Sequence, residues 1–171
     1  MSIDETQKKL NDYFTEKLET FGATAKGVDY NGEQAQQIRF AELVKVINPA
    51  SKFSVIDYGS GYGAMFEYIR SRGWDFEYYG VDLIEKMVIA GREKFKDFPN
   101  AHFAVDEKEI PVADYLVAAG IFNIKLEADY DEWKAFAESE GYDDTNVPKE
   151  TFLNAMERFK QTLGNESLWG E

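Results

Sequence analysis

The sequence predicts an α/β protein with a Rossmann-like parallel sheet of about four recognisable strands flanked by helices. Short apolar runs of strand length alternate with segments of helix length between residues 53 and 120, as in βαβ units. The last of these runs, within 113–120, is unbroken in its apolar character, which favours a strand buried on both faces. The first run leads into "DYGSGYG" at 57–63, where glycine occupies every second position.

The composition is that of one globular domain. The 171 residues are 44% hydrophobic and 15% aromatic, enough for a sizeable core. The chain has no cysteine, so disulfides, thiolate metal sites and cysteine nucleophiles are excluded. The first residues are charged and lack the apolar core of a signal peptide, and no apolar run approaches the roughly 20 residues of a membrane helix. We therefore expect a soluble, cytoplasmic protein.

The net charge of −13 comes from 32 acidic and 19 basic residues. Such a surface repels phosphate backbones, and no cluster of Lys and Arg offsets it. Nucleic acid is therefore a disfavoured partner.

Residues 1–50 are expected to form a helical N-terminal extension. A helix over 4–21 should end at Gly22, and residues 23–32, rich in small and turn-forming types, should form a loop. A second helix is predicted over 33–47. Its expected inward residues are Ile38, Leu43, Val44 and Ile47.

Residues 51–127 are expected to form the cofactor-binding core. Strands are predicted at 53–57, 76–82, within 99–106 and at 113–120. A short helix should run to Arg72 and be closed by Gly73, and a longer one should span 84–96. His102 is expected to be an ordinary residue of the third strand rather than a general base.

Residues 128–171 are expected to form a helical C-terminal segment of the same domain, with helices at 131–140 and 149–163. No fifth strand is recognisable in the sequence. A fourth strand at the end of the sheet would have an unpaired edge, so we expect self-association through that edge or by exchange of the helices at 131–163.

The segment after the first strand combines a carboxylate, Asp57, with glycines at 59, 61 and 63. Alternating glycines allow a sharp turn and close approach of a ligand to the backbone amides. The spacing differs from the G-x-G-x-x-G of dinucleotide sites, and the carboxylate is unfavourable for a pyrophosphate. The pattern predicts a nucleoside ligand that carries a positive charge.

Two further aspartates end the next strands. Asp82 follows the second strand, where a carboxylate is well placed to accept both hydroxyls of a ribose. Asp106 is expected to end the third strand, where a carboxylate could reach an adenine amino group. Each has a simpler interpretation, since Asp82 could be a helix N-cap and Asp106 an ordinary turn residue.

In these residues the sequence resembles the class I S-adenosylmethionine-dependent methyltransferases, over about residues 26–127. Residues 57–63 match their D-x-G-x-G-x-G loop, and "AAGIFN" at 118–123 resembles the segment that faces methionine and substrate. The stretch 26–40 resembles the helix before the first strand, where a basic residue, here Arg39, can meet the cofactor carboxylate. Arg39 could equally form a surface ion pair. The resemblance implies S-adenosylmethionine as cofactor and the following contact residues: Asp57, Gly59, Ser60, Gly61, Gly63, Asp82, Leu83, Asp106, Gly120 and Arg39.

The implied activity is methyl transfer to an unidentified small molecule or protein, with no metal. No catalytic residue can be assigned, and Asn123 and Tyr62 are candidates by position only. Two alternatives stay open. One is a module that binds S-adenosylmethionine or S-adenosylhomocysteine without catalysis, and the other is a nicotinamide-dependent oxidoreductase.

Overall fold

The computed structural model describes residues 3–119. The chain divides into two compact units, Asp4–Leu126 and Met1–Ile3 with Glu127–Glu171. Apart from Ile3, the described elements belong to the first unit. The helices predicted at 131–140 and 149–163, Gly120, Asn123 and the question of a fifth strand lie outside the described residues.

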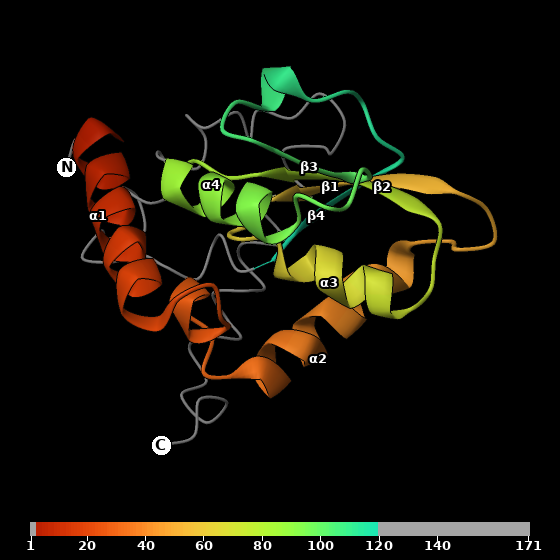
Figure 1. Cartoon of the computed structure of the whole chain (residues 1–171), viewed down its shortest axis with the longest axis horizontal. Coiled ribbons are helices and arrows are strands. Elements are labelled where there is room, and N and C mark those ends of the chain that lie inside the picture. Colours follow the sequence, from red (N-terminus) through yellow and green to blue (C-terminus); the bar gives the residue numbers. More distant parts are fainter. Residues whose placement is uncertain (1–2, 120–171) are drawn as a thin grey trace, which may run out of the picture. The chain divides into compact units, whose positions relative to one another are not determined.

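Helices and strands follow one another in the predicted order (Figure 1). The N-terminal part is helical, and a regular alternation of strand and helix follows it. The elements are α1 (Ile3–Phe21), η1 (Lys26–Val28), α2 (Glu33–Leu43), η2 (Val44–Val46), β1 (Phe53–Tyr58), α3 (Ala64–Ser71), β2 (Phe76–Val81), α4 (Glu85–Lys94), β3 (Ala101–Ala104), η3 (Glu107–Glu109) and β4 (Tyr115–Ala118).

The four strands form one parallel sheet in the order β3-β2-β1-β4. The chain first adds strands on one side of β1 and then crosses to its other side. In such open sheets ligands bind at the carboxyl ends of the strands, next to the point where the order reverses. This topology confirms the predicted fold class and places the loop after β1 at that point.

The described core lies on one face of the sheet. Phe66 of α3 lies 5.5 Å, between ring centroids, from both Phe76 and Tyr78 of β2, and 4.8 Å from Phe95 at the end of α4. Phe103 of β3 stacks on the same Phe95 at 6.0 Å. Edge-to-face and stacked aromatic pairs of this kind stabilise a core beyond their buried area.

Glycine ends two of the helices where the sequence predicts it. Gly22 has φ +66° and follows α1, and Gly73 has φ +70° and follows α3. These left-handed conformations are accessible to glycine at little cost and stop the helical hydrogen-bond ladder.

The predicted inward face of α2 is partly wrong. Ile38 is 59% exposed, whereas Gln36 and Phe40 are buried. Two residues along a helix turn through about 200°, so Ile38 faces away from the side that carries Gln36 and Phe40. Phe40 packs on Tyr68 of α3 with ring centroids 5.6 Å apart. The helix ends at Leu43, and η2 continues the chain with Val44 buried, as expected.

The expectation that the fourth strand is buried on both faces is also wrong. Val117 is 4% exposed, but its neighbour Leu116 is 65% exposed. Successive strand residues point to opposite faces, and β4 is the last strand of the described sheet on its side. Apolar character along the whole run therefore does not mean burial on both sides.

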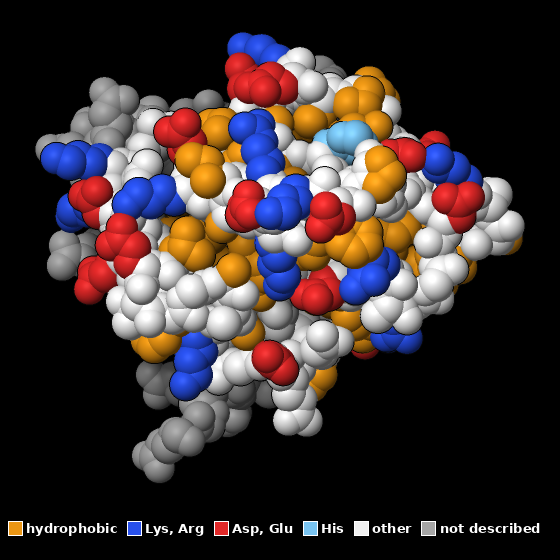
Figure 2. Space-filling view, viewed as in Figure 1, with side chains coloured by type: hydrophobic (Ala, Val, Ile, Leu, Met, Phe, Trp, Pro, Cys, Tyr) orange, Lys and Arg blue, Asp and Glu red, His pale blue; other side chains and the backbone are white. Residues whose placement is uncertain are grey.

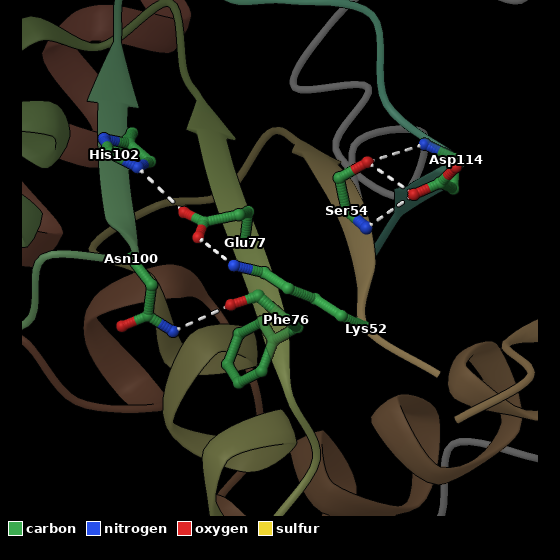
Figure 3. Close-up of polar contacts among 7 residues, drawn as sticks. All are labelled: Lys52, Ser54, Phe76, Glu77, Asn100, His102 and Asp114. Carbon is green, nitrogen blue, oxygen red and sulfur yellow. Dashed lines mark hydrogen bonds and ion pairs between the residues drawn. The ribbon is translucent and has the colours of Figure 1, made fainter. Parts of the chain in front are cut away.

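Polar contacts join the strands near their amino ends, on the opposite face from the core (Figure 3). Glu77 of β2 binds Lys52 at 2.8 Å and lies 3.3 Å from His102 of β3. Lys52 in particular holds the pKa of Glu77 below its usual value. His102 stacks on Tyr79 at 5.0 Å and is a surface residue of the strand, as expected.

The surface carries charges of both signs. On the face seen in Figure 2, basic and acidic side chains are interspersed rather than gathered into a field of one sign. Of the helices within 3–119, none is long and apolar enough to cross a membrane.

Candidate functional site

The loop after β1 turns sharply on its glycines. Gly59, Gly61 and Gly63 have φ values of +73°, +54° and +87°, and α3 begins directly after them at Ala64. Side chains rarely adopt this left-handed region, so the alternating glycines have a conformational cause.

Four amides of this loop, at 59, 60, 61 and 63, bind within the chain. Gly59 N and Ser60 N both donate to Val81 O, at 2.8 and 3.0 Å, and Gly63 N donates to Ser60 O at 3.0 Å. Gly61 N donates to a carboxylate oxygen of Asp82 at 2.7 Å. The sequence predicts that a ligand meets these amides, but each already has an acceptor. Anion sites need free N–H donors, so these four amides are not available to a diphosphate.

Packing also requires glycine at two positions of the loop. A Cβ on Gly61 would lie 2.7 Å from Val28 Cγ1, and one on Gly63 would lie 2.6 Å from Phe103 Cζ. The loop is therefore held between η1 on one side and the core aromatic residues on the other.

Asp57 is the buried carboxylate of the site, with 2% of its surface exposed. Its Oδ2 accepts a hydrogen bond from the Tyr78 hydroxyl at 2.7 Å, whereas its Oδ1 is buried without a partner. Burial raises the pKa of Asp57 to about 7, against the lowering effect of the Tyr78 hydrogen bond. A buried oxygen with no donor is costly, and a ligand that brings a donor would relieve that cost.

Asp82 lies at the end of β2, is half-buried, and binds the glycine loop. Oδ2 accepts from Gly61 N at 2.7 Å and Oδ1 from Ile84 N at 2.9 Å. Burial raises the pKa of Asp82 to about 6. An ionised carboxylate has about four acceptor positions, so each oxygen can take one further hydrogen bond. Leu83, the next residue, is 43% exposed.

Two residues that the sequence analysis missed, Tyr30 and Gln36, bring further polar atoms to this region. Among the described residues, the buried side-chain atoms without a partner are Tyr30 Oη, Gln36 Nε2 and Asp57 Oδ1. Burial raises the pKa of Tyr30, and the charge of Asp57 adds to the rise. The sequence gives only a weak signal for Gln36, which in the structure occupies a core-facing position of α2, four residues before Phe40.

Arg39 of α2 lies beside Tyr30. Its guanidinium carbon is 5.4 Å from the centroid of the Tyr30 ring, and its positive charge lowers the pKa of the Tyr30 phenol. Arg39, the residue predicted to bind the cofactor carboxylate, therefore lies beside Tyr30, whose buried hydroxyl has no partner.

Asp106 has a local role, and Tyr62 is buried. Asp106 follows β3, is exposed, and caps η3 by accepting from Lys108 N at 2.9 Å, which is the turn role considered above. Tyr62 is 4% exposed, and burial raises its pKa to about 12. Such a phenol stays protonated near neutral pH.

No protein-family model matches the chain. A sequence relative is the protein named "Putative methyltransferase Rv1506c" of Mycobacterium tuberculosis (strain ATCC 25618 / H37Rv), 38% identical over 96 residues. The match covers 56% of this chain and 58% of that protein. The chain therefore spans little more than half the length of this relative.

Solved structures of a methyltransferase and of a cyclopropane synthase share the fold. Phosphoethanolamine N-methyltransferase 1 of Haemonchus contortus, in complex with phosphoethanolamine and S-adenosylhomocysteine, matches 69% of this chain and 26% of its own, with 14% identity and a TM-score of 0.50. The apo form of a mycolic acid cyclopropane synthase matches 75% of this chain and 50% of its own, with 18% identity and a TM-score of 0.50. The predicted resemblance to class I methyltransferases is thereby confirmed, in sequence by one relative and in fold by these structures.

Proposed function

We propose that this chain binds S-adenosylmethionine at the carboxyl ends of β1 and β2 and transfers its methyl group to an acceptor. The observation that carries the proposal is the unpartnered Oδ1 of Asp57, buried beside a glycine loop of which four amides already donate within the chain. A buried anionic oxygen without a donor suits a ligand with a cationic end, such as the ammonium group of an amino acid. The related sequence named as a methyltransferase supports the same function.

The other polar groups fit the remaining parts of the cofactor. Asp82 keeps two acceptor positions for the ribose hydroxyls, and the exposed Leu83 beside it offers apolar surface to the adenine. Arg39, with Tyr30 and Gln36 near it, would hold the methionine carboxylate. Asp106 caps η3 through Oδ1, and its Oδ2 would accept from the adenine amino group.

S-adenosylmethionine, when bound, supplies a methyl group on a sulfonium sulfur that is already electrophilic. The contribution of this chain is to bind and orient that group and to keep water from the buried end of the site. Asp57 fixes the amino-acid end, and Asp82 fixes the nucleoside end. The acceptor is a small molecule or a protein, with residues 118–123 as its proposed neighbours.

The engaged loop amides argue against the nicotinamide alternative. A dinucleotide requires N–H donors for its pyrophosphate, and the loop amides at 59, 60, 61 and 63 already donate within the chain. The repulsion between a diphosphate and Asp57 acts in the same direction.

Calorimetric titration with S-adenosylmethionine, S-adenosylhomocysteine and NADH tests the proposal. We expect the two adenosyl compounds to bind and NADH not to bind. Asp57→Asn should weaken S-adenosylhomocysteine binding by about 1.5–3 kcal/mol, as for the loss of a hydrogen-bonded charge pair. Asp97→Asn, on an exposed turn, is the matched control. Binding of NADH alone would refute the assignment.

Turnover is tested separately. Release of S-adenosylhomocysteine from S-adenosylmethionine in the presence of candidate acceptors would establish an enzyme. Tight binding without release across small-molecule and protein acceptors would favour the non-catalytic module.

A further inference from the structure

We propose that Tyr78 is a positioning residue for Asp57, whose Oδ2 it holds so that Oδ1 is presented to the ammonium group of the ligand. The inference rests on the proposed function and adds a residue to it. Tyr78 is fully buried in the centre of β2, and neither the glycine pattern nor the strand-end aspartates point to it.

The sheet register explains the contact. Asp57 of β1 lies opposite Gly80, and Val55 lies opposite Tyr78. Asp57 and Tyr78 are thus diagonal neighbours on the inner face, a separation that a long side chain can bridge. A Cβ on Gly80 would lie 2.8 Å from both Ser60 Oγ and Phe103 Cδ1, so no larger residue can stand directly opposite Asp57. The hydroxyl of Tyr78 reaches the carboxylate instead, at 2.7 Å.

Tyr78, which donates this hydrogen bond to Asp57, is itself held by aromatic packing. The ring of Tyr78 is packed against Phe66 and Phe103, with centroids 5.5 and 5.7 Å away. Burial, followed by the charge of Asp57, raises the pKa of Tyr78 well above its usual value, so the phenol stays a donor. A tyrosine packed against two rings holds in turn the carboxylate that accepts from it.

Other groups also face Asp57 and affect its ionisation. The charge of Asp82, at the end of the same strand as Tyr78, raises the pKa of Asp57, and the Tyr78 hydrogen bond lowers it. Tyr30 comes from the segment before α2, with Arg39 beside it. Ser60 lies beside the Tyr78 hydroxyl. Among these groups, Tyr78 donates directly to the carboxylate, so its removal should shift the titration of Asp57 upward.

The test is Tyr78→Phe, which removes the hydroxyl and keeps the ring. Dissociation constants are measured between about pH 6 and pH 8.5 for S-adenosylhomocysteine, which has the ammonium group, and 5′-methylthioadenosine, which lacks the amino acid. We expect S-adenosylhomocysteine binding to weaken roughly five- to tenfold at about pH 6.5 and to come within about twofold of the unchanged protein at pH 8.5, as for a rise of about one pH unit in the midpoint. Binding of 5′-methylthioadenosine should change less than about twofold.

Tyr68→Phe is the matched control. Tyr68 of α3 is also buried, and its hydroxyl accepts from Arg72, just after that helix, rather than contacting Asp57. An unchanged pH midpoint in Tyr78→Phe, or equal weakening of both ligands, would overturn the positioning role.

A measurement without ligand separates this inference from the proposed function. The carboxyl carbon of Asp57, identified by its loss in Asp57→Asn, is titrated by NMR in the two proteins. A higher midpoint in Tyr78→Phe supports the positioning role even if no adenosyl compound binds, and an equal midpoint overturns it. Absence of S-adenosylhomocysteine binding to the unchanged protein refutes the proposed function instead.

Discussion

The ring of Phe103 lies against the α-carbon of Gly91, so that a Cβ at position 91 would be 2.7 Å from Phe103 Cε1. The same ring would meet a Cβ on Gly63 at 2.6 Å and one on Gly80 at 2.8 Å. One aromatic residue of β3 therefore fills the space left by glycines of α4, the loop after β1, and β2. The candidate site is built on this packing.

Gly91→Ala should destabilise the protein, although alanine normally stabilises a helix interior by about 1 kcal/mol relative to glycine. The added methyl group collides with the buried ring, and overpacking costs about 1–3 kcal/mol. Urea unfolding measures the change, with Ile89→Ala on the exposed side of α4 as the control for helix propensity.

A double variant tests whether the collision with Phe103 causes the loss of stability. In Gly91→Ala with Phe103→Leu, the smaller side chain should remove the collision, so the double variant should be more stable than the sum of the single effects indicates. Additive losses would show that Phe103 is not the residue that excludes a side chain at 91.

Stability should fall as the pH rises through the titration of Asp57. Burial raises its pKa to about 7 in the folded state, above the usual value of 3.8 that it regains on unfolding. Between these values the folded state binds more protons, so the free energy of unfolding decreases from about pH 4 to about pH 7. The loss should be roughly 1–3 kcal/mol for a buried carboxyl of this kind, and Asp82 acts in the same direction.

Comparison with Asp57→Asn isolates this effect. The difference in unfolding free energy between the unchanged protein and the variant should shrink or change sign as the pH rises from about 5 to 8. Measurements start near pH 5 because Glu77 and Asp114, whose pKa values are lowered, lose their stabilising contribution at more acidic pH. A difference that is constant with pH would show that Asp57 does not titrate in this range.

The strands, the helix-ending glycines and the loop at Asp57 could be predicted from the sequence because each depends on neighbouring residues. Gly22 and Gly73 stop helices through their own backbone conformation. Asp57 lies at the end of β1 because the apolar run before it is a strand. These features depend on short stretches of sequence, so patterns within those stretches predict them.

The contacts that shape the site could not be predicted in this way. Tyr78 meets Asp57 across 21 positions of sequence, and Phe103 meets Gly63 across 40, so both depend on strand register and order. Gln36 carried a weak signal, as a polar residue at a core-facing position. The exposure of Ile38 was mispredicted because the apolar spacing of α2 alone did not identify which side packs on α3.

Ser54 of β1 and Asp114, directly before β4, bind each other and join the two strands at the start of β4 (Figure 3). Ser54 N and Ser54 Oγ both donate to Asp114 Oδ2, at 2.8 and 2.7 Å, and Asp114 N donates to Ser54 Oγ at 2.9 Å. Asp114→Ala removes two of these bonds, so the amides of β4 should exchange hydrogen faster while those in β2 stay protected. Glu109→Ala, an exposed carboxylate on η3, is the control, and equal exchange in β4 for both variants would contradict the role of Asp114.

Asp82 should stabilise the fold in the absence of any ligand. It joins the amide of Gly61 in the loop to that of Ile84 before α4 through its two carboxylate oxygens. Asp82→Asn keeps one oxygen and turns an NH₂ group toward the other amide, which leaves a donor without an acceptor at a cost of about 1–3 kcal/mol. Urea unfolding without ligand should show this loss, and the Gly61 amide should exchange faster. Asp12→Asn, on the exposed side of α1, should leave both unchanged. If Asp82→Asn weakened S-adenosylhomocysteine binding without any loss of stability or protection, Asp82 would serve the ligand alone and the loop would be held by its other contacts.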